Sequence, residues 1–174
     1  MMAKASLTAI SNASPLIALS AIQQLELLKE IFQEVIIPEV VYEEVVLSGT
    51  EKPGANEVAA ANWIIRRRVK HSKAVRKLQK RYHLGQGEAE TILLAEQMKA
   101  DWLILDERRA RQAAIKRKHK IIGTLGILLL AKDRGLIQSA PALHPLLMFL
   151  RITLSPFSDT CSITRSTILI SSIR

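Results

Sequence analysis

Three acidic residues and one amide stand at or near the ends of predicted strands and helices, and all four side chains offer oxygen atoms. They are Asn12, Glu44, Glu88 and Asp106. Carboxylates that are brought together repel one another unless a cation lies between them. Mg²⁺ and Mn²⁺ prefer oxygen ligands, and such ions can activate water for attack on a phosphodiester. We therefore expect the four residues to form a metal site in which Asp106, Glu88 and Glu44 are catalytic.

Each of these positions also has a simpler structural interpretation, and the sequence leaves both open. Asn12 could be a turn residue, and Glu44 could lie on the solvated face of a helix. Glu88 could be a first-turn acid that is favoured by the helix dipole. Asp106 could cap the helix predicted to follow it, from Arg108 to Lys116.

The placement of Asp106 depends on the apolar run Leu103-Ile104-Leu105, which predicts a short buried strand and stops at two acids and two arginines. Similar signals recur along the chain, with strand-like and helix-like segments in alternation. This alternation indicates an α/β fold with a mainly parallel sheet. In such sheets ligands bind at the carboxyl ends of the strands.

The predicted strands are 7–11, 35–37, 63–65, 102–105 and 120–122. The predicted helices begin with one that Ser14 caps and Pro15 opens, followed by 25–32, 39–47, 55–62, a helix from about 72, 88–99, 107–117, 125–134 and 140–150.

Positive charge dominates the composition. The chain has 174 residues, a formal net charge of +9 and a pI of about 10.0, a balance that favours association with polyanions such as nucleic acid. The segment 66–81 carries nine Lys or Arg and no acid. We expect it to bind RNA through Arg76, Lys77, Lys80 and Arg81, although a solvated helix would show the same charges. No helix-turn-helix pattern supports the less favoured interpretation, a DNA-binding regulator.

Several other classes of protein are disfavoured by composition. Cys161 is the single cysteine, so neither a disulfide framework nor a cysteine-based zinc site is expected, and a reducing, cytoplasmic setting fits. No apolar run approaches the roughly 18 residues of a membrane span. The histidines lack metal-ligand spacing, and the chain has no G-x-S-x-G nucleophile motif. From residue 151 to 174 the chain becomes rich in Ser, Thr and Ile without a clear period, so we treat it as an atypical tail.

Five short segments occur in an order that resembles a known family. They are 11–17 (SNASPLI), 37–45 (IPEVVYEEV), 85–90 (GQGEAE), 105–109 (LDERR) and 123–126 (GTLG). The chain resembles the PIN-like proteins of uncharacterised function in prokaryotes that are related to VapC toxins. The resemblance implies a PIN-like domain over residues 7–150, folded as a three-layer α/β/α sandwich around a mainly parallel sheet. It further implies a divalent-metal-dependent ribonuclease of toxin–antitoxin type, with Mg²⁺ or Mn²⁺ as cofactor, a small antitoxin as partner and a homodimer as assembly.

The resemblance also places the site residues. Asp106 matches a metal-binding aspartate, Glu88 the acid that opens the central helix, and Glu44 the acid of the helix after the second strand. Asn12 stands where most active PIN nucleases have an aspartate. An amide oxygen can ligate a metal but brings no charge, so the affinity for a cation should be lower. The alternative is therefore a catalytically weak PIN-like protein that binds RNA or a partner.

Overall fold

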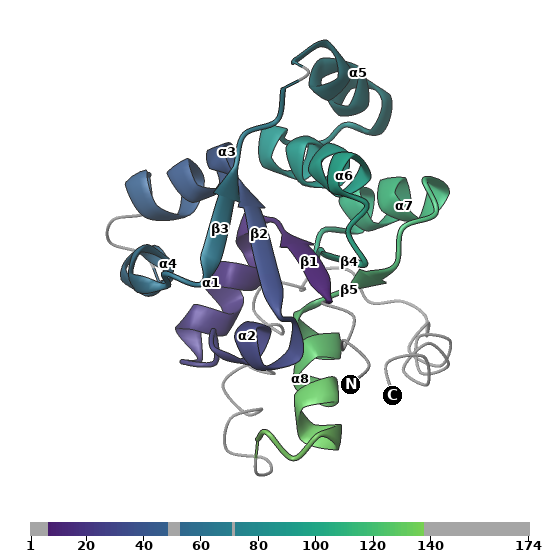
Figure 1. Ribbon diagram of the computed structural model, residues 1–174. Coiled ribbons are helices and arrows are strands. Elements are labelled where there is room, and N and C mark those ends of the chain that lie inside the picture. Colours follow the sequence, from purple (N-terminus) through teal and green to yellow (C-terminus); the bar gives the residue numbers. More distant parts are fainter. Residues whose placement is uncertain (1–6, 49–52, 71, 138–174) are drawn as a thin grey trace, which may run out of the picture.

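A parallel sheet of five strands forms the centre of the molecule, with helices on both of its faces (Figure 1). The computed structural model describes residues 7–48, 53–70 and 72–137. The strand order is β3-β2-β1-β4-β5, and every pairing is parallel. The strands are β1 (Thr8–Ser11), β2 (Glu34–Pro38), β3 (Ile64–Arg67), β4 (Trp102–Ile104) and β5 (Ile121–Ile122). The predicted α/β class and its parallel sheet are confirmed.

The inner strands β2 and β4 are apolar on both faces because each face is covered by helices. In β2, Val35 and Ile37 pack into one core and Ile36 packs into the other. In β4, Ile104 belongs to the first core and Leu103 to the second. This alternation explains why buried parallel strands have continuous rather than alternating hydrophobicity. It also produces the three layers.

Eight α-helices and one π-helical segment are found in the described part of the chain. They are α1 (Ala13–Ala21), α2 (Leu27–Ile31), α3 (Glu39–Tyr42), the π-helical segment η1 (Glu43–Leu47), α4 (Ala55–Ala60), α5 (Ser72–Tyr82), α6 (Gln86–Met98), α7 (Arg108–Lys116) and α8 (Thr124–Asp133). Helices α1, α2 and α8 supply much of the core on one face of the sheet, and α5, α6 and α7 supply the core on the other. Helix α5 lies at the upper end of the view in Figure 1, far from α2 and α8.

Two helix starts beside the site differ from the prediction. The first helix begins at Ala13 with Asn12 as its N-cap residue, so Ser14 lies inside the helix. Helix α6 begins at Gln86 because the side chain of Glu88 turns back to the N–H of Gly85, which stabilises an earlier start than the apolar pattern indicates.

The predicted helix 39–47 is divided. It is α-helical to Tyr42 and then π-helical, with the N–H of Ser48 donating to the carbonyl of Glu43 at 2.9 Å, five residues back. The predicted helix 140–150 and the boundary of the tail at residue 151 lie outside the described residues.

No helix in the described ranges combines the length and the hydrophobicity that crossing a bilayer requires.

Candidate active site

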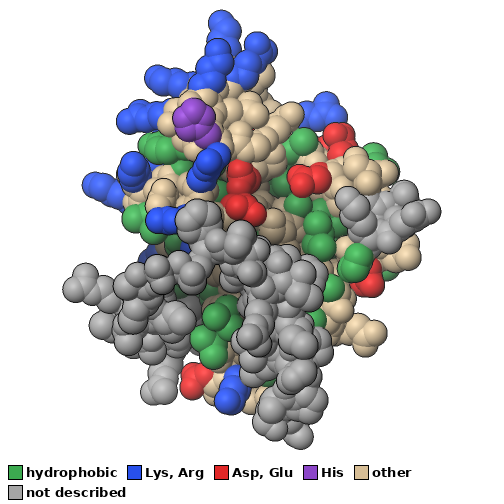
Figure 2. Space-filling model, turned by 180° about the vertical axis from the view of Figure 1, so that it is seen from behind, with side chains coloured by type: hydrophobic (Ala, Val, Ile, Leu, Met, Phe, Trp, Pro, Cys, Tyr) green, Lys and Arg blue, Asp and Glu red, His purple; other side chains and the backbone are tan. Residues whose placement is uncertain are grey.

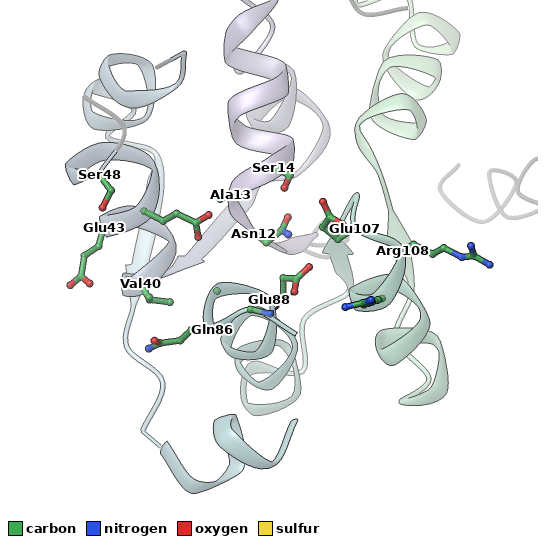
Figure 3. Close-up of a pocket in the computed structure, with 14 residues that line it drawn as sticks. Asn12, Ala13, Ser14, Val40, Glu43, Ser48, Gln86, Glu88, Glu107 and Arg108 are labelled. Carbon is green, nitrogen blue, oxygen red and sulfur yellow. Dashed lines mark hydrogen bonds between the residues drawn. The ribbon is translucent and has the colours of Figure 1, made fainter. Parts of the chain in front are cut away.

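A cavity of about 860 Å³ opens at the carboxyl end of the sheet. Its walls come from the residues after β1, from α3 and η1, from the first turn of α6 and from the start of α7 (Figure 3). Strands β1 and β4 are neighbours in the sheet, but the chain runs from β1 outward to β2 and β3 before it returns to form β4 and β5. The cavity therefore lies where the strand order reverses, the usual position of a ligand crevice in an open α/β sheet.

Asn12 forms the floor of this site. Its backbone N–H donates to the carbonyl of Ile104 at 3.3 Å, which joins the ends of β1 and β4. Only 3% of the residue is exposed, and its Oδ1 atom is buried without a hydrogen-bond partner among the described residues. The side chain does not cap α1. An acceptor buried without a partner costs roughly 1–3 kcal/mol, so Oδ1 is an atom that a cation or a donor would satisfy.

Glu88 lines the cavity as the third residue of α6. Its Oε2 atom accepts a hydrogen bond of 2.7 Å from the backbone N–H of Gly85, so the interpretation as a first-turn acid is correct for one of its two oxygens. Burial raises the pKa of Glu88, and the carboxylates of Glu107 and Glu44 raise it further, against the opposing effects of the Gly85 N–H and Arg109. The carboxylates of Glu107 and Glu44 are therefore near enough to Glu88 to repel its negative charge.

Glu44 reaches the same cavity from η1. Its Oε2 atom lies so close to Gly87 that a Cβ atom on that residue would be 3.1 Å from the oxygen and 3.2 Å from Val41. The glycine therefore allows η1 and α6 to approach closely. Both carboxylates therefore line one cavity, Glu44 from η1 and Glu88 from α6.

Asp106 takes a different position from the one expected. It is not among the described residues that line the cavity, whereas its neighbour Glu107 is. The Asp106 carboxylate instead accepts two hydrogen bonds from Thr124, one from the backbone N–H at 2.8 Å and one from the hydroxyl at 2.5 Å. Asp106 thus caps α8, whereas the simpler interpretation that the sequence left open had placed this cap on the following helix, α7. Glu107 was not predicted as a site residue, although the signal was present as a second acid directly after the first.

Figure 3 shows Asn12, Glu88 and Glu107 around a common space, with the side chain of Arg108 extending away from it. In the part of the chain that the structure describes, no three acidic, His or Cys side chains lie close enough together to hold one ion by themselves. The available donors are the unpartnered amide oxygen and separate carboxylates. This set fits Mg²⁺ or Mn²⁺, because Mg²⁺ commonly uses one or two carboxylates and keeps several waters.

The predicted RNA-binding residues lie on α5, outside the cavity wall. Arg76, Lys77, Lys80 and Arg81 are all exposed, while Val75 and Leu78 of the same helix are buried against the rest of the domain. Figure 2 shows Lys and Arg side chains gathered at the end of the molecule that α5 occupies, with acidic side chains below them. Since α5 ends at Tyr82 and α6 starts at Gln86, the basic helix leads directly to the cavity rim.

Comparison with known proteins identifies the family. A family model described as PIN domain matches residues 8–156. The chain belongs to the PIN domain family. The solved structures similar to this PIN domain include the crystal structure of PAE2754 from Pyrobaculum aerophilum, with a TM-score of 0.53 and 13% sequence identity over 73% of this chain and 96% of that chain. At that identity the likeness is one of fold. No curated protein matches the PIN domain described here.

Proposed function

We propose that this PIN-domain protein is a divalent-metal-dependent ribonuclease of toxin–antitoxin type, which cleaves RNA phosphodiesters at an Mg²⁺ or Mn²⁺ site in the cavity. The observation that carries the proposal is made at Asn12. Its buried Oδ1 atom has no partner among the described residues, and the residue lines a cavity together with several acids. An apolar substrate would leave both the unpartnered oxygen and the neighbouring carboxylates uncompensated. A hard divalent cation compensates both.

Asn12 and one or two nearby carboxylates would hold the ion, with waters as the remaining ligands. The candidate carboxylates are those of Glu44, Glu88 and one acid from the β4–α7 loop, where Asp106 and Glu107 are adjacent. When bound, the ion would lower the pKa of a water and stabilise the charge that develops on the phosphate. The chain itself orients the ligands. The N–H of Gly85 fixes one oxygen of Glu88 and leaves the other for the cavity, and the absence of a side chain at Gly87 leaves room for the Glu44 carboxylate beside α6.

Arginine side chains favour RNA as the substrate of this site. Arg109 contributes to the cavity wall, Arg108 stands at its edge with its side chain extending outward, and the four cations of α5 lie on the helix that leads to the cavity. Phosphate contacts of this kind position a polyanion without reading its sequence. We therefore propose that RNA lies along α5 and enters the cavity past the first turn of α6.

The proposal extends to regulation and assembly, with a small antitoxin as partner and a homodimer as the unit. A growth assay tests the toxin role. Induced expression of the wild type should arrest growth, and expression of Glu88→Gln to the same level should not. Light scattering on the purified protein tests the assembly. A homodimer should have twice the mass of one chain.

A second candidate function is RNA or partner binding without efficient cleavage. Asn12 is the specific observation that favours it, because the residue on the floor of the cavity is a neutral amide. One charge fewer in the site should weaken cation binding and slow the reaction. This alternative predicts RNA binding that does not depend on the metal and leaves the RNA intact.

The deciding experiment is an RNA cleavage assay on a single-stranded substrate with Mn²⁺, Mg²⁺ or EDTA. The proposal predicts cleavage with either metal, none with EDTA, and a loss of at least about 100-fold in Glu88→Gln, the scale for removing a group that acts on the reacting atoms. Glu30→Gln is the matched control, since this exposed acid on α2 is distant from the cavity. Equal cleavage in metal and in EDTA would reject the metal-dependent mechanism.

A further inference from the structure

Two adjacent acids follow β4, and they are bonded differently. Asp106 has both carboxylate oxygens engaged by Thr124, with Oδ1 accepting from the backbone N–H and Oδ2 from the hydroxyl. Thr124 is the first residue of α8 and is only 2% exposed. A carboxylate at the N-terminus of a helix is stabilised by the N–H groups that the helix leaves unpaired. The contacts of Asp106 are therefore those of a helix cap.

Asp106 is an exposed residue, but its carboxylate has close neighbours on one side. A Cβ atom on Gly123 would lie 2.8 Å from Asp106 Oδ1 and 2.9 Å from the guanidinium of Arg111. Arg111 in turn donates to the carbonyl of Leu105 at 2.8 Å, on the residue just before Asp106. The carboxylate thus lies against the start of α8, the Gly123 backbone and Arg111 of α7. In this position Asp106 is not among the residues that line the cavity.

Glu107 has none of these restraints. It is the N-cap residue of α7, but its side chain forms no capping hydrogen bond, and no hydrogen bond or ion pair engages its carboxylate among the described residues. Its backbone is extended, with φ −62° and ψ 126°, so its side chain leaves the chain in a different direction from that of Asp106. Glu107 lines the cavity that Asn12 and Glu88 also line (Figure 3).

We propose that Glu107, rather than Asp106, is the acid that the β4–α7 loop contributes to the cation site, and that Asp106 is a positioning residue that ties this loop to α8 through Thr124. The inference rests on the proposed metal site. It assigns to each of the two acids a role that the other cannot replace. Glu107 supplies a free carboxylate with a long side chain, and Asp106 supplies the anchored loop from which that side chain extends.

The test compares Glu107→Gln with Asp106→Asn, both of which keep size and remove charge. Mn²⁺ binding is measured by calorimetry, and melting temperature is measured in EDTA, so neither readout depends on activity. Glu107→Gln should weaken Mn²⁺ binding by about ten-fold or more and should leave the melting temperature in EDTA unchanged or slightly raised, since it removes a like charge beside Glu88. Asp106→Asn should lower the melting temperature in EDTA, and it should weaken Mn²⁺ binding less than Glu107→Gln does.

The Asp106–Thr124 link is tested separately by adding Thr124→Val to each variant. In the Asp106→Asn background, Thr124→Val should lower the melting temperature less than it does in the wild type, because the hydrogen bond from the Thr124 hydroxyl is already impaired. In the Glu107→Gln background, Thr124→Val should lower the melting temperature as much as it does in the wild type. Additive costs in both backgrounds would overturn the positioning role.

The results separate this inference from the proposed function. If the wild type binds Mn²⁺ and Glu107→Gln binds it equally well, the assignment of Glu107 fails while the metal site stands. If Asp106→Asn abolishes Mn²⁺ binding with its melting temperature in EDTA unchanged, Asp106 is the ligand and the inference is overturned. If the wild type binds no Mn²⁺, the proposed function fails and the ligand role of Glu107 fails with it, whereas the link to Thr124 is still decided by the melting data.

Discussion

Glu96 on α6 accepts hydrogen bonds from both the Nε and the Nη2 atoms of Arg117, the residue that follows α7, with the Nη2 bond at 2.7 Å. The pair joins two helices that cover the same face of the sheet. Its hydrogen bonds, together with the charge of the guanidinium, lower the pKa of Glu96 against the opposing effect of burial. Two parallel bonds of this kind are the stronger form of an arginine–carboxylate pair.

Because the pKa of Glu96 is lower in the folded state, the pair should stabilise the protein above the ordinary pKa of about 4.5 and lose this effect as the pH falls below it. Glu96→Gln should therefore be less stable than the wild type at pH 7 by about 1 kcal/mol or less, since both side chains are partly exposed. The difference should shrink towards pH 3. Urea denaturation of both proteins across this range measures it, with Glu30→Gln as control. A difference independent of pH would contradict the prediction.

Asn12→Asp should make the site more dependent on metal. The substitution adds a charge to a buried position beside Glu44 and Glu88, so the melting temperature in EDTA should fall. On addition of Mn²⁺ the melting temperature should rise more than in the wild type, because a carboxylate binds the ion more strongly than an amide. RNA cleavage should increase, or appear if the wild type is inactive.

The matched control for this substitution is Asn62→Asp, which adds the same charge at an exposed position. If Asn12 serves only as a turn residue, Asn12→Asp should melt like the wild type with and without Mn²⁺. Equal metal-induced shifts in all three proteins would remove Asn12 from the site.

Replacing the four cations of α5, Arg76, Lys77, Lys80 and Arg81, by Ala should weaken RNA binding and flatten its salt dependence. For single-stranded RNA the logarithmic slope should fall by about 0.7 for each phosphate that the protein no longer neutralises. Filter binding across a salt titration measures both effects. The control replaces Lys29, Lys132 and Arg134, exposed cations of α2 and the end of α8, on a part of the molecule distant from α5 (Figure 1). Equal effects per charge in the two variants would show only a general effect of net charge.

Gly123→Ala should destabilise the protein, because its Cβ atom would press on Asp106 and Arg111 at less than 3 Å. Either the start of α8 or the β4–α7 loop would have to move to relieve this clash. We expect the free energy of unfolding to fall by roughly 1–3 kcal/mol, the range for overpacking. Gly85→Ala is the control, since the nearest atom to its added Cβ lies at 3.5 Å. Chemical denaturation compares the two variants, and equal stability would show that the residues around Asp106 can move to make room for the added Cβ atom.

Much of the fold could be predicted because the strands and helices follow from local patterns. The run Val35-Ile36-Ile37, closed by Pro38, specifies a buried parallel strand, since each of its faces meets a hydrophobic core. The basic helix that begins at Ser72 follows likewise from its apolar spacing. The π-helical segment could not be predicted, because the hydrogen bond that defines it, from Ser48 to Glu43, depends on how the whole segment packs and has no signature in the sequence.

The sequence predicts which ends of strands and helices form the candidate site, but it predicts less well which side chains face the cavity. Asn12, Glu44 and Glu88 line one cavity because their elements all end or begin at the carboxyl edge of the sheet. Which of Asp106 and Glu107 faces that cavity depends on the loop conformation after β4 and on Thr124, a partner 18 residues further along the chain. A contact over that separation leaves no local pattern, so neighbouring acids cannot be told apart from the sequence.

The position of β1 in the middle of the sheet has a consequence for the order in which the protein folds. Thr8 bonds to Glu34, 26 residues along the chain, and its backbone N–H bonds to Asp101, 93 residues along. Asn12 and Glu44 leave the ribosome well before Glu107, a delay of several seconds at a synthesis rate of roughly 5–20 residues per second. Pairing of β1 with β4 is intrinsically slow, because the long stretch of chain between them must close into a loop, at a cost in entropy, before the two strands make contacts. The acidic cavity is therefore incomplete until β4 has joined β1, so a growing chain carries half of the site without the other half.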